Sequence, residues 1–98
     1  MALNIFWSKR ASLKFDQIIS FLIAEWGEKS ANEFIIKVFD FLETLSEFPE
    51  IGSIENNEKN IRGFTIVKQI TIFYRIKNDK IFLLLLFDNR QNPMRKKL

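Results

Sequence analysis

The sequence predicts a small α+β domain, with an N-terminal strand, an antiparallel helical hairpin and a three-stranded antiparallel meander whose one face the helices cover. Three observations support this class. Apolar residues recur at steps of three and four through residues 9–48, strand-like runs fill residues 61–87, and one long polar connection separates the two regions. A chain of 98 residues, 47% hydrophobic and 28% charged, is expected to fold as a single domain over residues 1–98.

The N-terminal half reads as a strand followed by two helices. Residues 3–7 are short, apolar and β-prone, and they end at Ser8, which is a favourable N-cap for a helix over residues 9–26. Gly27 is expected to cap that helix, and a second helix follows over residues 28–48. Because almost no loop separates them, the helices must pack antiparallel.

The C-terminal half contains three predicted strands, at residues 61–67, 69–77 and 80–87. Asn78 and Asp79 tolerate positive φ, which predicts a two-residue hairpin turn between the last two strands. An unbroken register from this turn places one set of side chains against the helices: Ile70, Ile72, Tyr74, Ile76, Ile81, Leu83, Leu85 and Phe87.

The opposite face of the hairpin combines polar, cationic and large apolar groups. Two helices cover only one face of a small sheet, so four apolar side chains are expected in water: Phe73, Phe82, Leu84 and Leu86. Such a patch usually marks a partner surface. The alternative is that the C-terminal tail or a second copy of the chain covers it.

Composition excludes several kinds of chemistry. The chain has no cysteine and no histidine, so we expect no disulfide, no metal site and no cofactor. No run of about 18 apolar residues is present, and we expect a cytoplasmic protein without a membrane partner. The net charge of +3 permits an anionic partner.

Several local motifs follow one another along the chain: Trp7-Ser8 with Ala11, Trp26-Gly27 with Ala31 and Phe34, Pro49-Glu50-Ile51-Gly52, Arg62, "IFYRI" at 72–76 and "DNRQNP" at 88–93. Their order and spacing resemble the RelE/ParE toxins of bacterial type II toxin–antitoxin systems over nearly the whole length. The ParE-like branch is favoured.

The resemblance implies a growth-inhibiting toxin, of the kind linked to plasmid stabilisation, that a cognate antitoxin neutralises in a hetero-oligomer. It also implies that the antitoxin binds the patch of Phe73, Phe82, Leu84 and Leu86. Members resembling ParE act on DNA gyrase, and members resembling RelE cut messenger RNA on the ribosome. Fold alone does not decide between these targets.

The candidate site residues favour gyrase as the target. RelE-like enzymes use clustered Lys and Arg, often with Glu, and a Tyr or His near the C-terminus, whereas this chain has neither Tyr nor His after Phe87. The predicted target-binding residues are Arg62, Arg75 and Arg90; a ribonuclease would add Lys59 to them. A third hypothesis is an inactive relative that serves only as a binding partner.

Structural roles for the same residues stay open at this point. A two-residue turn at Lys68-Gln69 would place Arg62 directly across from Arg75, although either arginine could instead form an ordinary ion pair with Asp88 or Glu55. Three aromatic side chains are interpreted as core: Trp7, Trp26 and Tyr74. Residues 94–98 are expected to form a flexible basic tail.

Overall fold

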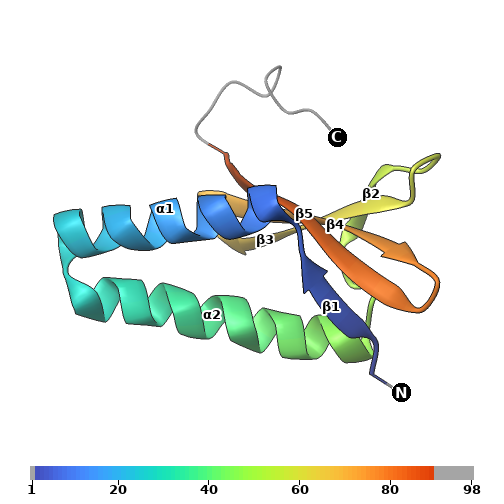
Figure 1. Ribbon diagram of the computed structural model, residues 1–98, viewed down its shortest axis with the longest axis horizontal. Helices are drawn as coiled ribbons and strands as arrows, with labels where there is room; N and C mark the ends of the chain where they lie inside the picture. Colours follow the sequence, from blue (N-terminus) through green and yellow to red (C-terminus); the bar gives the residue numbers. More distant parts are fainter. Residues whose placement is uncertain (1, 90–98) are drawn as a thin grey trace.

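The computed structural model describes residues 2–89 and shows two helices packed on one five-stranded sheet (Figure 1). The elements in chain order are β1 (Asn4–Trp7), α1 (Lys9–Trp26), α2 (Glu28–Glu47), β2 (Ser53–Asn56), β3 (Ile61–Val67), β4 (Ile70–Lys77) and β5 (Lys80–Asp88). The strand order is β1-β5-β4-β3-β2, with β1 parallel to β5 and the other neighbours antiparallel. The predicted class, hairpin and meander are confirmed. Strand β2 was not predicted, since its residues lie in the connection where a loop was expected.

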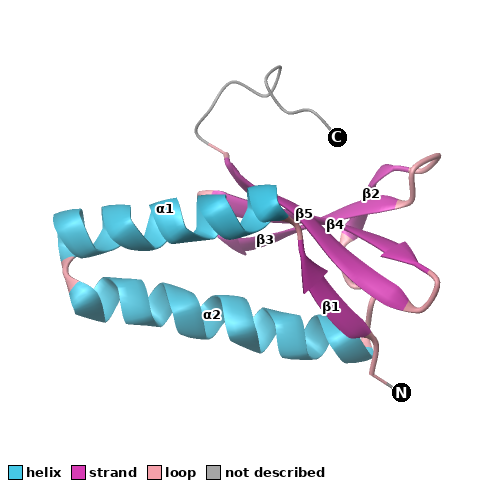
Figure 2. Ribbon diagram, in the orientation of Figure 1, coloured by secondary structure: helices cyan, strands magenta, loops and turns pink. Residues whose placement is uncertain are grey.

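The helical hairpin forms where the sequence places it. The hydroxyl of Ser8 accepts a hydrogen bond from the Ala11 amide and donates one to the Leu84 carbonyl, both at 3.0 Å, so the N-cap also fastens α1 to β5. Gly27 has a φ of 91°, which lets the chain reverse between the helices without a longer loop. Figure 2 shows the two helices side by side, with their connection projecting past the sheet.

The main core lies between the helices and one face of the sheet, called here the helix face. Its buried residues are Ala11, Phe34, Val38, Phe41, Leu42, Leu45, Ile70, Ile72, Tyr74, Ile81, Leu83 and Leu86. The opposite face, called here the far face, carries a second buried cluster of Ile61, Phe73, Leu85 and Phe87. Among the described residues, no helix is long and apolar enough to span a membrane.

The β4–β5 turn is the one predicted. Asn78 and Asp79 have φ values of 51° and 60°, and Lys77 pairs with Lys80. Two successive residues with positive φ match the right-handed twist of the flanking strands. The register therefore begins as expected.

A β-bulge then changes the register within the run of leucines. Tyr74 pairs with Leu83, but Phe73 pairs with Leu85, so Leu84 is an extra residue in β5. Because a shift of one residue exchanges the two faces of a strand, Leu86 enters the helix-face core. The same shift turns Leu85 and Phe87 to the far face, so the predicted faces of Leu85, Leu86 and Phe87 were wrong.

A second bulge lies in β3. Val67 pairs with Ile70 across a two-residue turn, whereas Thr65 pairs with Thr71, which leaves Ile66 as the extra residue. The bulge allows Ile66 to pack against the main core together with its neighbour Val67.

This second bulge decides on which face of the sheet Arg62 lies. Arg62 pairs with Tyr74 and not with Arg75, so the expected pairing of the two arginines was wrong. Because Tyr74 belongs to the helix face, Arg62 lies on that face, and Arg75 lies on the far face with Ile61 as its partner. The two arginines therefore have different surroundings.

Candidate functional site

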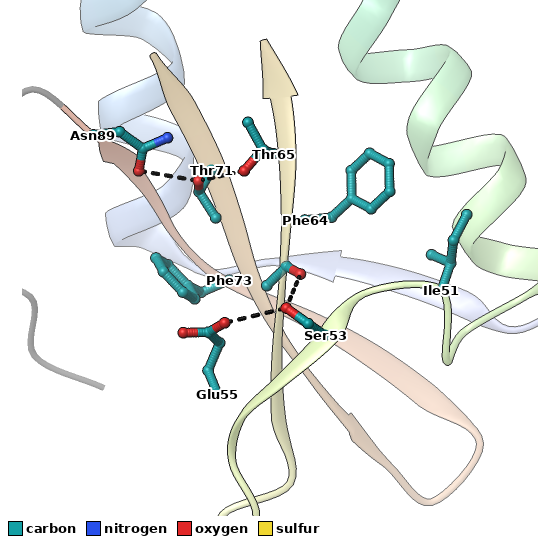
Figure 3. Close-up of a pocket in the computed structure, with 9 residues that line it drawn as sticks. Ile51, Ser53, Glu55, Phe64, Thr65, Thr71, Phe73 and Asn89 are labelled. Carbon is teal, nitrogen blue, oxygen red and sulfur yellow. Dashed lines mark hydrogen bonds between the residues drawn. The ribbon is translucent and has the colours of Figure 1, made fainter. Parts of the chain in front are cut away.

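A groove of about 400 Å³ lies on the far face, across β2, β3 and β4 (Figure 3). Its lining residues are Ile51, Ser53, Glu55, Gly63, Phe64, Thr65, Thr71, Phe73 and Asn89. Its polar side chains carry hydroxyl, amide and carboxylate groups. None of the lining residues that the structure describes is a lysine or an arginine.

A row of hydroxyl and amide groups forms one end of the groove. The Thr65 and Thr71 hydroxyls lie 3.0 Å apart across β3 and β4, and the Thr71 hydroxyl donates to the Asn89 side-chain oxygen at 3.0 Å. The Asn89 amide nitrogen donates in turn to the Lys68 carbonyl at 3.3 Å. These bonds connect the end of β5 to the β3–β4 turn and fix the polar groups in place.

A carboxylate stands at the other end of the groove. The Ser53 hydroxyl lies 3.2 Å from Glu55 Oε2 and 3.4 Å from the Gly63 carbonyl, and it donates to these oxygens (Figure 3). A Cβ at Gly63 would stand 2.9 Å from the Phe73 ring and 3.2 Å from Glu55 Cγ, so only glycine fits between them. Glu55 can accept a proton or bind a donor at this position.

Arg62 has a structural position. Its Nη1 donates to the Gly52 carbonyl at 2.8 Å and to the Glu50 carbonyl at 3.2 Å, and its Nη2 lies 3.7 Å from the Glu50 carboxylate. The side chain is 16% exposed. Its ion-pair partner is therefore Glu50 and not Asp88 or Glu55, the two partners that the sequence suggested. We infer that Arg62 holds the turn after α2 and leaves little surface for a target.

Tyr74 completes the attachment of the same turn. Its hydroxyl accepts a hydrogen bond from the Gly52 amide at 2.8 Å and donates one to the Pro49 carbonyl at 2.8 Å. Burial raises the pKa of this hydroxyl above its usual value of 10.0, against the smaller opposing effects of the Gly52 bond and the Arg62 charge. A Cβ at Gly52 would stand 2.7 Å from the Tyr74 hydroxyl. The prediction that Tyr74 is a core residue is confirmed.

The other predicted cations are more dispersed. Arg75 is exposed on the far face, two residues along β4 from Phe73 of the groove. Lys59 is exposed in the loop between β2 and β3. Arg90 lies outside the described residues, as does the tail at residues 94–98. The side chains of Arg62 and Arg75 therefore lie on opposite faces of the sheet.

The predicted antitoxin-binding patch is not one exposed surface. Phe73 is 2% exposed and Leu86 is 0% exposed. Phe73 packs with Leu85 and Phe87 in the far-face cluster, and the bulge at Leu84 puts Leu86 in the main core. Phe82 and Leu84 are half-buried on or beside the far face. The expectation of exposure was wrong for Phe73 and Leu86.

Exposed apolar side chains gather instead on the helical hairpin. A groove of about 540 Å³ runs between α1 and the end of the sheet, and its lining includes Phe21, Trp26, Phe34, Val67 and Ile70. Phe21 is 48% exposed and Trp26 is 72% exposed, so the interpretation of Trp26 as core was wrong. Its position at the last residue of α1, beyond the sheet, explains the exposure.

The family model described as "ParE toxin of type II toxin-antitoxin system, parDE" matches residues 5–93. The chain belongs to the ParE toxin family. No curated protein sequence is similar enough to this toxin to count as a match.

Solved structures share the fold of this toxin at low sequence identity. The toxin resembles a chain of the chromosomal ParDE system from P. aeruginosa with a TM-score of 0.74 and 15% identity, covering 89% of this chain and 96% of that one. It resembles the YoeB dimer from Staphylococcus aureus with a TM-score of 0.63 and 14% identity, covering 89% and 97%. It also resembles a chain of the YoeB-YefM heterotetramer from the same species, with a TM-score of 0.60 and 12% identity, covering 89% of this chain and 97% of that one. At these identities the likeness concerns the fold.

Sequence reasoning missed most of the groove residues of this toxin. Glu55 and Ser53 lie in a strand that was not predicted, and Thr65 and Thr71 become neighbours only through the register that the β3 bulge sets. The one available signal was the alternation of Ser53 and Glu55, which suits a short edge strand.

Proposed function

We propose that this ParE-family toxin inhibits growth in the cytoplasm by binding a macromolecular target, with DNA gyrase as the favoured target. The observation that carries the proposal is the exposed position of Arg75 on the far face. In residues 2–89 this side chain has no ion-pair partner, so its charge is available to a target. Arg90 is proposed to act beside it.

Binding is favoured over RNA cleavage by the surroundings of the groups that would transfer protons. The chain has one tyrosine and no histidine, and that tyrosine is buried with its hydroxyl in two hydrogen bonds. A phosphorane also needs a cation beside it. The described lining of the far-face groove provides a carboxylate and hydroxyls, and Arg62 is turned to the other face.

Ribonuclease activity remains the second candidate because of Glu55. This carboxylate lies in a groove of about 400 Å³ on the same face as Arg75, which would give a base and a cation for cleavage through a 2′-hydroxyl. In this alternative Lys59 and Arg90 would bind phosphate together with Arg75, and Arg62 would position β2.

We further propose that a cognate antitoxin binds the groove between α1 and the end of the sheet. Phe21 and Trp26 offer exposed rings there, and an amphipathic segment of the antitoxin would bury them. The membership in a toxin–antitoxin family and the likeness to chains from such systems support this partner. Phe82 and Leu84 are a second contact region in the proposal.

One experiment separates the two targets. The toxin is expressed without its antitoxin while the integrity of translated messages and the supercoiling of DNA are followed in the same culture. Double-strand breaks or loss of supercoiling with intact messages support gyrase. Codon-phased cuts in translated messages contradict it and support the ribonuclease, in which case Glu55→Gln should abolish the cuts. Normal growth supports the inactive relative.

A second experiment tests the antitoxin groove. The double variant Phe21→Ser, Trp26→Ser is expected to lose most of its co-purification with the co-produced antitoxin, because two exposed rings no longer contribute apolar area. Phe48→Ser, at a side chain that is 61% exposed and outside the groove, is the matched control. Equal retention of the antitoxin by both variants would rule out this groove.

A further inference from the structure

The end of the β4–β5 hairpin carries cations that the proposed function does not use. Lys77 and Lys80 are exposed and pair directly across the two strands. Like charges placed opposite each other in a sheet repel. Within residues 2–89 neither ammonium group has an ion-pair partner, and Arg75 extends the same cationic side of the far face. An anion bound here would relieve the repulsion.

An aromatic stack lies beside these lysines. Phe6 of β1 pairs with Phe82 of β5, and their rings stack with centroids 5.6 Å apart and planes inclined by 25°. Strand β1 is at the edge of the sheet, so the stack has a neighbouring strand on one side only, and Phe6 is 43% exposed. The Lys80 ammonium lies 5.9 Å from the centre of the Phe6 ring. A cation and an exposed ring therefore share one site.

These features favour a ligand that carries both a negative charge and a flat ring at each repeat. Single-stranded nucleic acid has this chemistry, because its phosphates bind lysines and its unpaired bases stack on aromatic side chains. An acidic peptide would satisfy the lysines but would leave the outer side of the Phe6–Phe82 stack unused. A duplex would present phosphates with its bases already stacked.

We propose that the hairpin-end surface, formed by Phe6, Lys77, Lys80 and Phe82, binds single-stranded nucleic acid. Phosphates lie on the two lysines, and one base continues the stack on the outer side of Phe6. The inference goes beyond the proposed function and does not rest on the choice of target, since its residues line neither the far-face groove nor the groove beside α1. Only Phe82 is shared with the second antitoxin contact region proposed above.

The test uses the purified full chain and a fluorescein-labelled oligouridylate of about 12 nucleotides, within the size of known single-strand sites. Anisotropy is measured over a range of salt concentrations. The double variant Lys77→Gln, Lys80→Gln is expected to bind at least about tenfold more weakly at low salt. It should also lower the slope of log affinity against log salt by about 1.4, which is about 0.7 for each lost phosphate contact. The control Lys29→Gln, Lys37→Gln removes the same charge from the exposed surface of α2 and should keep the slope.

The stacking part is tested separately. Phe6→Leu should weaken binding about tenfold, whereas Phe6→Tyr, which keeps the ring, and Phe48→Leu, at an exposed ring outside the proposed surface, should bind as the parent does. Four results would overturn the proposal: no binding at low salt, equal loss in the two lysine pairs, duplex RNA competing as well as the single strand, or polyglutamate competing as well as the oligonucleotide. The last would identify an acidic protein segment as the occupant.

Discussion

The turn after α2 and the end of the β4–β5 hairpin both contain cationic side chains, but these are bonded to the backbone at the turn and exposed to solvent at the hairpin end. At the turn, Arg62 and Tyr74 donate to backbone carbonyls and hold the chain between Pro49 and Gly52. At the hairpin end, Arg75 and Lys77 are exposed and have no ion-pair partner in residues 2–89. The comparison shows that a cation's role here follows from the face on which it lies. The bulge in β3 sets that face for Arg62, and the Asn78-Asp79 turn sets it for Arg75 and Lys77.

Alanine substitutions at Leu86 and Leu84 test the bulge in β5, and the first is expected to change the free energy of unfolding most. Leu86→Ala should lower the free energy of unfolding by about 2–5 kcal/mol, because it leaves a cavity in the main core. Leu84→Ala, at a half-buried side chain, should lower the free energy of unfolding by about 1 kcal/mol. Chemical denaturation of both variants measures the difference, and a larger loss for Leu84 would mean that the register of β5 is the unbroken one.

Gly52→Ala should lower the free energy of unfolding by about 1–3 kcal/mol, because the added Cβ meets the Tyr74 hydroxyl and the Gly63 carbonyl. In the double variant with Tyr74→Phe, the hydroxyl is absent and part of the overlap disappears. The double variant should therefore be less destabilised than the sum of the two single variants. Strict additivity would show that the Gly52–Tyr74 contact is not the cause.

A matched pair of substitutions tests whether Arg62 is structural and Arg75 is not. Arg62→Gln should lower the free energy of unfolding by about 1–3 kcal/mol, because the partly buried Gly52 carbonyl loses its charged donor. Arg75→Gln should change it by less than about 0.5 kcal/mol, as exposed substitutions usually do. Thermal unfolding distinguishes them, and the opposite order would exchange the roles that we assign to the two residues.

The smallest effect concerns pH. The pKa of Tyr74 is raised in the folded chain, so the folded state keeps the phenol proton where the unfolded state releases it. The contribution of Tyr74 to stability is complete below pH 10.0 and is lost as pH rises from there through the folded pKa. Tyr74→Phe should remove this part of the alkaline loss, while other groups titrate equally in both proteins. Identical alkaline profiles would contradict the assignment.

The helices, the Ser8 cap, the Gly27 reversal and the Asn78-Asp79 turn were predictable because each depends on residues close in sequence. The bulges were not predictable. In the run Leu83 to Leu86 every register presents a leucine to the core, so periodicity carries no information about which residue is extra.

The candidate site was predicted less well than the fold. The groove depends on β2, whose pairing with β3 rests on backbone hydrogen bonds and not on an apolar face, since Ile54 is 57% exposed. Without that strand, neither the position of Glu55 nor the attachment of Arg62 to Gly52 was visible in the sequence.

The most direct test of the division between the two regions is a growth assay combined with thermal unfolding of Arg75→Ala. The variant is expected to lose toxicity when it is expressed without antitoxin, while the purified chain keeps the melting temperature of the parent. Arg10→Ala, at an exposed arginine of α1, should keep both. Full toxicity of Arg75→Ala, or a loss of toxicity that accompanies a fall in melting temperature, would contradict the assignment of Arg75 to target binding.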